Sequence, residues 1–158
     1  MSLLNARQLV RQAIRLEENG ERFYRRWTER ADDPDNKEFF LYLADEEVKH
    51  RRLFENLAEE VSDCPMDTEV YGEYMAYMQG FVDDTLFNEK VYGGEMEKIN
   101  TLPEAVEFAM RQELDSVLFY LELKTFVPSA QEEMIEAIVK EERCHYASLL
   151  KFKRDLNA

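Results

Sequence analysis

Two segments of the chain have closely similar sequences: residues 13–24 read AIRLEENGERFY, and residues 109–120 read AMRQELDSVLFY. A second pair follows at nearly the same offset, with EEVKH at residues 46–50 and EERCH at residues 141–145. Around all four segments, apolar residues recur at alternating steps of three and four, which is the period of one helix face. The chain is therefore predicted to contain two similar helical hairpins related by a pseudo-twofold axis.

Prolines and polar capping residues divide the chain into four long helices and one long connection. We expect the helices over roughly residues 3–31, 36–61, 101–126 and 129–156. Capping boxes, in which a glutamate follows the capping residue by three positions, are expected at Asp35, Thr101 and Ser129. The connections within each pair of helices are short, so each hairpin should be antiparallel.

The connection between the two hairpins covers roughly residues 62–101, which is too long for an irregular loop inside one domain. We expect it to contain a helix at 69–87 and a loop near Gly93 and Gly94. The expected helix is rich in aromatic and methionine residues, namely Tyr71, Tyr74, Met75, Tyr77, Met78, Phe81 and Phe87. It can be a crossover helix packed on the bundle, a lid over a functional site or a dimer contact, and the sequence does not decide among these.

The composition excludes several classes of protein. The 158 residues suffice for a single domain, expected to span residues 1–158, and only 5 glycines and 4 prolines argue against a turn-rich all-β fold. A net charge of −14 repels nucleic acids and anionic membrane surfaces. The sequence contains no run of 18 apolar residues, and MSLLNARQLVRQAIRLEE at its start is charged too early for the apolar part of a secretory leader. We therefore expect a cytoplasmic protein without a membrane span.

Each predicted helix carries a glutamate in the middle of its otherwise apolar seam. These glutamates are Glu17, Glu47, Glu113 and Glu142. The second and fourth helices add a histidine three residues later, at His50 and His145, and residues three apart on a helix project within about 60° of each other. The sequence therefore predicts six polar side chains that converge inside the bundle.

Four buried carboxylates need positive charge nearby, because desolvation and mutual repulsion both oppose their ionisation. No lysine or arginine lies on these seams, so bound cations or protonation of the carboxylates must supply the balance. Two divalent metal ions would match the four negative charges, with the two imidazoles as neutral ligands. Mixed oxygen and imidazole ligands suit iron, manganese or zinc better than calcium or copper(I). A metal-free structural bundle is the alternative.

The chain resembles the rubrerythrin-like branch of the ferritin-like superfamily, most specifically in AIRLEENGERFY, LADEEVKH, AVEFAMRQELDSVLFY and IVKEERCH. In ferritin-like di-iron and di-manganese bundles, two helices each supply a glutamate and the other two each supply a Glu-x-x-His motif. The resemblance covers the four main helices and implies an all-α, ferritin-like four-helix bundle. It also implies a centre of two iron ions, with manganese or zinc as alternatives. The implied ligands are Glu17, Glu47, His50, Glu113, Glu142 and His145.

The resemblance further implies an oxidoreductase that reacts with hydrogen peroxide or dioxygen in defence against oxidative stress. Full-length rubrerythrins carry a rubredoxin-type domain with paired Cys-x-x-Cys motifs, which this chain lacks, so electrons are expected from a separate protein such as a rubredoxin. Rubrerythrins also hold an additional glutamate one turn past the ligand of the third helix, where this chain has Ser116. An iron-binding or ferroxidase protein linked to iron storage is the alternative function, and a homodimer is the expected assembly.

Four residues near the predicted ligands have expected supporting roles. Tyr24 and Tyr120 follow Glu17 and Glu113 by seven residues, which places each phenol on the ligand face of its helix. We expect each phenol to hydrogen-bond a ligand carboxylate or to supply an electron, and a core tyrosine without either role is the alternative. Gly20 and Ser116 are small, which leaves room for an oxidant or allows close helix packing.

Three further residues lie next to the predicted ligands in sequence but away from them on the helix. Glu46 and Glu141 directly precede ligands and point about 100° away from them, so a solvated position is expected. Cys144 lies about 200° from Glu142, and we expect it to be a buried structural thiol. Together with Cys64 it is one of only two cysteines, too few for a zinc cluster or a disulfide framework.

Overall fold

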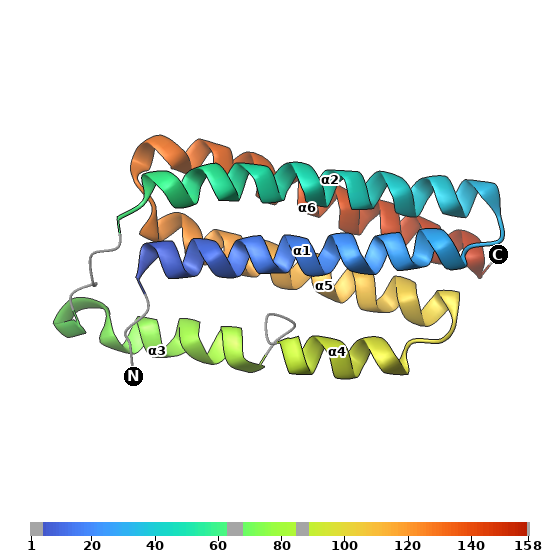
Figure 1. The fold of residues 1–158 in the computed structure, drawn as a ribbon, viewed down its shortest axis with the longest axis horizontal. Helices are drawn as coiled ribbons and strands as arrows, with labels where there is room; N and C mark the ends of the chain where they lie inside the picture. Colours follow the sequence, from blue (N-terminus) through green and yellow to red (C-terminus); the bar gives the residue numbers. More distant parts are fainter. Residues whose placement is uncertain (1–4, 63–67, 85–88, 158) are drawn as a thin grey trace.

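The computed structural model describes residues 5–62, 68–84 and 89–157. Its elements follow the order α1 (Ala6–Arg30), α2 (Pro34–Glu60), α3 (Thr68–Asp84), α4 (Glu89–Lys98), α5 (Leu102–Leu123), the 3-10 turn η1 (Lys124–Phe126) and α6 (Ser129–Leu156). The four long helices run alongside one another, with α3 and α4 laid end to end beside them (Figure 1). The prediction of an all-α bundle of four long helices is confirmed. None of the described helices is both long and apolar enough to cross a membrane.

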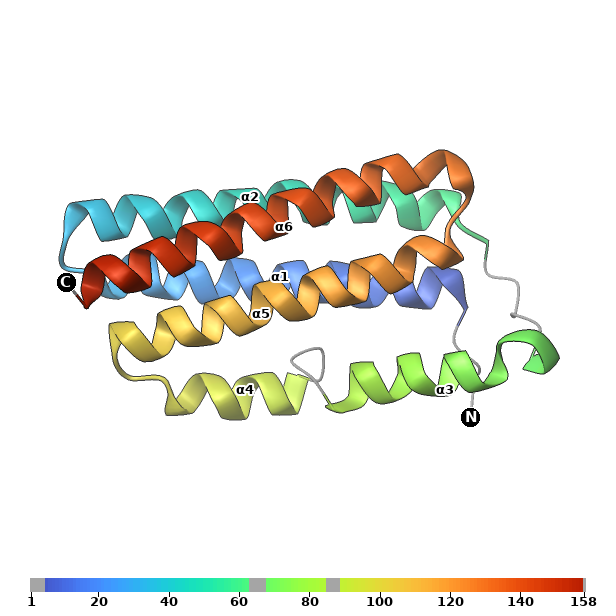
Figure 2. The same ribbon diagram turned by 180° about the vertical axis from the view of Figure 1, so that it is seen from behind.

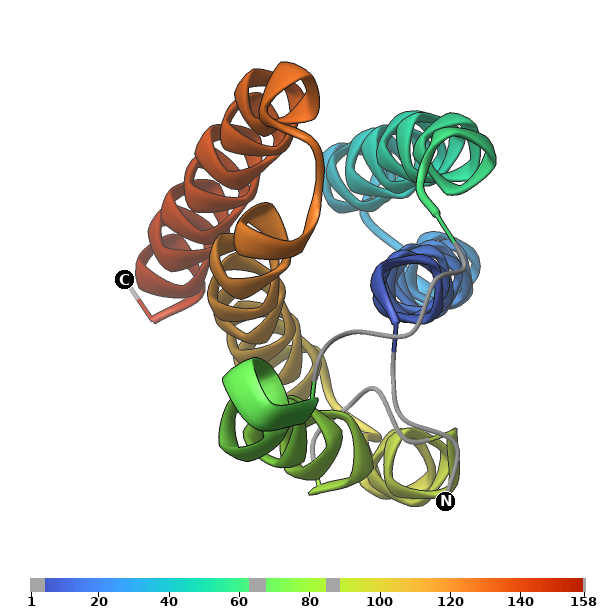
Figure 3. The same ribbon diagram turned by 90° about the vertical axis from the view of Figure 1, so that its left-hand side faces the viewer.

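The four long helices form two hairpins that face each other. Helix α1 packs against α2 and α5 packs against α6, while α1 also contacts α5 and α2 contacts α6. Seen end-on, the two hairpins form opposite halves of the bundle, and α3 and α4 lie along the side formed by α1 and α5 (Figure 3). The view from behind shows α5 and α6 in front of the first hairpin (Figure 2). This is the arrangement that the sequence repeat predicts.

The starts of the long helices differ in part from the expected capping boxes. At the start of α5 the box is present, because the backbone N–H of Thr101 donates to Glu104 Oε2 at 3.0 Å. Helix α2 begins earlier than expected: Asp33 is its capping residue and accepts from the backbone N–H of Asp35 at 2.9 Å. Pro34 occupies the first helical position there, where its fixed φ fits and its missing N–H is not needed. The expected box at Ser129 is wrong, since that residue is already helical.

The loop expected near Gly93 and Gly94 is wrong, because both glycines lie inside helix α4. Tertiary contacts outweigh the cost of about 1 kcal/mol that each glycine imposes on a helix. Tyr92 is buried, packs against Phe108 with ring centroids 5.7 Å apart, and donates a hydrogen bond to the carbonyl oxygen of Asn19. The connection therefore contains two helices rather than one.

Helix α3 corresponds to the helix expected at 69–87, and the structure shows it packed against α5. Its buried residues are Met75, Met78 and Val82. Tyr74 stacks on Phe126 with centroids 5.1 Å apart, which fixes the helix against the end of α5. The side chains of Tyr71 and Phe87 lie outside the described residues. A lid over the site or a dimer contact through this helix stays a hypothesis.

Two apolar clusters fill the bundle and leave a polar layer between them. The cluster near the start of α1 includes Leu9, Leu57, Met78, Leu123 and Ile138. The cluster near the end of α1 includes Phe23, Phe40, Tyr92, Phe108 and Leu149. Along each long helix, the predicted ligands fall between the residues of these two clusters. The fold thereby encloses the polar layer on both sides with tightly packed apolar side chains.

Candidate metal centre

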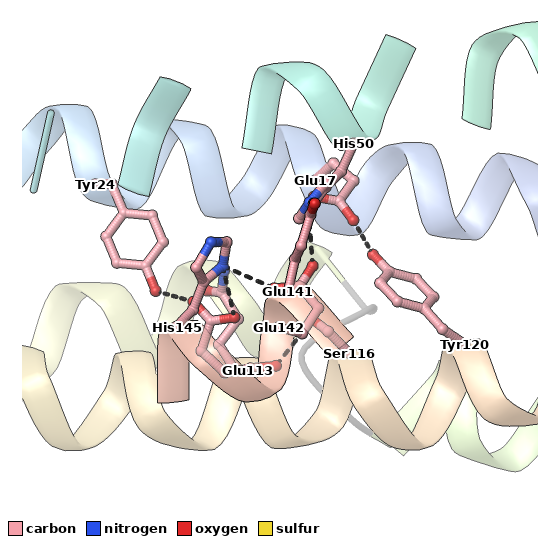
Figure 4. A network of polar contacts seen from close by, with 10 residues as sticks. Glu17, Tyr24, His50, Glu113, Ser116, Tyr120, Glu141, Glu142 and His145 are labelled. Carbon is pink, nitrogen blue, oxygen red and sulfur yellow. Dashed lines mark hydrogen bonds and ion pairs between the residues drawn. The ribbon is translucent and has the colours of Figure 1, made fainter. Parts of the chain in front are cut away.

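All six predicted ligand side chains come together in the polar layer. Each is at most 4% exposed to solvent, and all four long helices contribute at least one of them. These residues are Glu17 on α1, Glu47 and His50 on α2, Glu113 on α5, and Glu142 and His145 on α6. Figure 4 shows five of them pointing toward one another from opposite sides of the bundle.

The geometry divides the centre into two similar halves that share Glu142. Its Oε1 lies 3.0 Å from Nδ1 of His50, and its Oε2 lies 3.1 Å from Nδ1 of His145. Glu17 Oε2 lies 3.7 Å from His50 Nδ1, and Glu113 Oε2 lies 3.7 Å from His145 Nδ1. The sequence repeat is thus matched by nearly equal distances in the two halves.

The donor atoms at this centre fit a pair of metal ions. Six buried side-chain atoms make no hydrogen bond of good geometry with the described residues, and four of them belong to predicted ligands: Glu17 Oε2, Glu47 Oε1, Glu142 Oε1 and His50 Nδ1. The last two lie 3.0 Å apart as an ion pair. One group of donors within 4.8 Å of one another consists of Glu47, Glu113, Glu142 and His145, and a second consists of Glu17, His50 and Glu142. Carboxylate oxygen and imidazole nitrogen are ligands that iron, manganese and zinc accept. The residues therefore suit a di-metal site in which Glu142 belongs to both positions.

Without metal, burial keeps protons on the central carboxyl groups. Burial raises the pKa of Glu47 well above its usual range, and the neighbouring Glu17 carboxylate raises it further. Burial and the repulsion of Glu142 raise the pKa of Glu113 to about 8. Both pKa shifts favour the protonated form of these two carboxyl groups in the metal-free protein.

The neighbouring carboxylates favour the charged form of the two histidines in the metal-free protein. Burial disfavours the imidazolium of His50, but the adjacent Glu142 and Glu17 outweigh burial and raise its pKa to about 12. Burial likewise opposes the charge on His145, and Glu113 and Glu142 raise its pKa to about 10. Protons thus supply the positive charge that the buried carboxylates require when metal ions are not bound.

Metal binding should release protons and strengthen as the pH rises. A metal ligand must be deprotonated, and the raised pKa values of Glu113 and His145 lie at or above neutral pH. For each proton that binding releases, we expect the apparent affinity for Co²⁺ to rise about tenfold per pH unit between pH 6 and 8. Calorimetric titration in two buffers of different ionisation enthalpy measures the number of protons released. An affinity that does not change over this pH range would contradict the prediction.

The two tyrosines bond the carboxylates of the opposite half. Tyr24 on α1 donates a hydrogen bond to Glu113 on α5, and Tyr120 on α5 donates to Glu17 on α1. Both tyrosines are fully buried, and burial together with the adjacent carboxylate raises the pKa of each phenol well above its usual value. Each phenol therefore stays protonated and holds one carboxylate in place.

The small residues beside the ligands have different surroundings. A Cβ placed on Gly20 would overlap the Glu47 carboxylate and lie 2.7 Å from Nε2 of Gln112. Ser116, at the corresponding position of α5, donates its hydroxyl to the carbonyl oxygen of Gln112 at 3.0 Å. Gln112 is a buried polar residue that we did not expect at the centre, because the corresponding position in the first half is Leu16.

The outer sides of these helices agree with the expectations in one case and differ in two. Glu141 is exposed as expected, and its Oε2 also lies 2.7 Å from Nε2 of His50 on the neighbouring helix. Cys144 is exposed rather than buried, because α6 buries only the face that points into the bundle. Glu46 is also expected to be solvated, but its side chain is only 14% exposed and pairs with Lys49 on its own helix.

Comparisons with known proteins show the family and the fold of the chain. The family model described as Rubrerythrin matches residues 8–153. Among solved structures, the chain is similar to one described as a ferritin-like diiron-carboxylate protein from Thermotoga maritima, with a TM-score of 0.69 and 27% sequence identity. That alignment covers 98% of this chain and 97% of that chain. No curated protein sequence matches the chain.

Proposed function

Because the chain belongs to the rubrerythrin family, we propose that its centre binds two iron ions and reduces hydrogen peroxide or dioxygen with electrons from a separate donor protein. The observation that carries this proposal is the convergence of six buried carboxylate and imidazole side chains, with Glu17 Oε2 and Glu47 Oε1 left without a hydrogen-bond partner among the described residues. The similar Thermotoga maritima protein is described as a diiron-carboxylate protein, which supports iron as the metal.

Each residue of the centre has a distinct part in this proposal. Glu17 and His50 would hold one ion, Glu47, Glu113 and His145 would hold the other, and Glu142 would belong to both positions. When bound, two ferrous ions would supply the two electrons that convert hydrogen peroxide and two protons into two molecules of water. Tyr24 holds the Glu113 carboxylate and Tyr120 holds the Glu17 carboxylate. The two apolar clusters keep bulk water away from the centre.

The surroundings of Ser116 favour a second candidate function, that of a ferroxidase linked to iron storage or homeostasis. Rubrerythrins place an additional glutamate at this position. Here the Ser116 hydroxyl bonds back to its own helix, so the chain offers six ligands and no additional carboxylate at that point. A peroxidase cycle that needs the additional carboxylate would not run on this centre, whereas oxidation of ferrous iron would.

Stopped-flow oxidation separates the two functions. The protein would be loaded anaerobically with two Fe²⁺ per chain and mixed with hydrogen peroxide or with dissolved dioxygen, in the presence of a reductant. We expect rapid oxidation by peroxide and many turnovers while the iron stays bound. A single turnover followed by release or mineralisation of iron would favour the ferroxidase. Failure to bind two iron ions would contradict both.

A further inference from the structure

The two halves of the centre differ at the outer nitrogen of their histidines. His50 is fully buried, and its Nε2 lies 2.7 Å from Oε2 of Glu141, while its Nδ1 faces Glu17 and Glu142 (Figure 4). On the other side, the ring of His145 lies edge-on to Tyr42, with centroids 6.2 Å apart. Among the described residues, His50 has a carboxylate at Nε2 as well as at Nδ1, whereas the carboxylates next to His145 lie at its Nδ1.

This difference originates in the sequence repeat. Glu46 is the residue that corresponds to Glu141, and Cys144 is the residue that corresponds to Lys49. The Lys49 ammonium pairs with Glu46, although Glu46 lies within 4.8 Å of His50 and Glu141. Since a cysteine replaces the lysine in the second half, no ammonium at that position competes for Glu141, and its carboxylate bonds His50.

We propose that Glu141 is a positioning residue that makes the two metal positions unequal, so that the position on Glu17 and His50 fills first and binds more tightly. This inference rests on the proposed two-metal function. A carboxylate that accepts the outer N–H of an imidazole fixes the tautomer whose other nitrogen is free to bind metal, and it raises the basicity of that nitrogen. In the described part of the chain, no carboxylate pairs with Nε2 of His145, so the position on Glu113 and His145 fills second.

A Co²⁺ titration followed by visible absorption and calorimetry tests the order of filling. We expect the parent protein to bind two ions in two steps whose dissociation constants differ by about tenfold or more. Glu141→Gln keeps the size and removes the charge, and it should weaken the tighter step by about 10–100-fold. The matched control Glu46→Gln alters the corresponding residue, which lies nearby but does not bond a histidine, and should change both steps by less than about threefold.

A spectroscopic readout separates a bond to His50 from a general effect on folding. In the Co²⁺-loaded protein, each ligating imidazole keeps one exchangeable ring N–H, which gives a strongly shifted proton NMR signal. Glu141→Ala removes the acceptor, so one of these two signals should exchange faster with solvent while the other is unchanged. Glu141 is half-exposed, so both variants are expected to retain the helical circular dichroism of the parent.

The outcomes distinguish this inference from the function on which it rests. If the parent binds two Co²⁺ ions but Glu141→Gln and Glu141→Ala leave both steps and both N–H signals unchanged, the inference is wrong and the two-metal function stands. An effect of Glu46→Gln as large as that of Glu141→Gln would also overturn it. A parent protein that binds fewer than two ions would overturn the proposed function and this inference with it.

Discussion

Glu142→Ala is expected to lower tight metal binding from two ions per chain to fewer than one. The two carboxylate oxygens of Glu142 lie 3.0 and 3.1 Å from the inner nitrogens of His50 and His145. Both groups of donors include this residue, so its removal takes a ligand from each position at once. No other predicted ligand has this double role, and no other single substitution should have so large an effect on binding.

The loss of metal binding in Glu142→Ala should also reduce the gain in Tm that added metal gives. Two ions present at about 100 times their dissociation constants stabilise a protein by roughly 5 kcal/mol together, which corresponds to roughly 10–20 °C in Tm for a chain of this size. We expect the parent to show a gain of this order on adding Co²⁺ and Glu142→Ala to lose most of it. The matched control is Glu133→Ala, an exposed glutamate on the same helix, which should keep the full gain. Two tightly bound ions in Glu142→Ala, measured by elemental analysis, would refute the assignment.

Gly20→Ala should weaken metal binding at least about tenfold while the fold is retained. The added Cβ would overlap the Glu47 carboxylate and lie 2.7 Å from Nε2 of Gln112, both of which are side-chain ends that can move without a shift of the backbone. Helix propensity favours alanine over glycine by about 1 kcal/mol and offsets part of the packing cost. The displaced group is a predicted ligand, so the effect should fall on metal affinity.

A second glycine provides the control for this substitution. Gly80 lies in helix α3, and a Cβ there would meet nothing within 4 Å. Gly80→Ala is therefore expected to raise the free energy of unfolding by about 0.5–1 kcal/mol and to leave metal affinity unchanged. Thermal melts of the metal-free proteins and Co²⁺ titrations of each variant measure the two effects separately. If Gly20→Ala binds Co²⁺ as tightly as the parent, the position of the Glu47 carboxylate beside Gly20 does not matter for metal binding, and the prediction is wrong.

The sequence predicts the centre well because its signal repeats in every long helix. A buried glutamate at the middle of an apolar seam is costly, and four such residues with two histidines at the same level leave few other arrangements. The structure brings all six side chains together, and it places the phenols of Tyr24 and Tyr120 on ligand carboxylates. Their service as metal ligands stays a prediction.

The features that the sequence does not predict depend on neighbouring helices. The 100° angle between Glu141 and Glu142 describes one helix alone, whereas His50 approaches Glu141 from α2. Gly93 and Gly94 suggest a loop until the burial of Tyr92 against α1 and α5 is taken into account. Packing between helices determines both the contact of Glu141 with His50 and the helical state of Gly93 and Gly94. The pattern within a single helix cannot predict such packing.

The crossed tyrosines have a consequence for how the centre could arise. Tyr24 bonds Glu113 and Tyr120 bonds Glu17, so neither hairpin alone contains both a ligand carboxylate and the tyrosine that holds it. An ancestral single hairpin would have gained these contacts only by pairing with a second copy of itself. Assembly of the centre is then an all-or-none event, reached when both hairpins have docked.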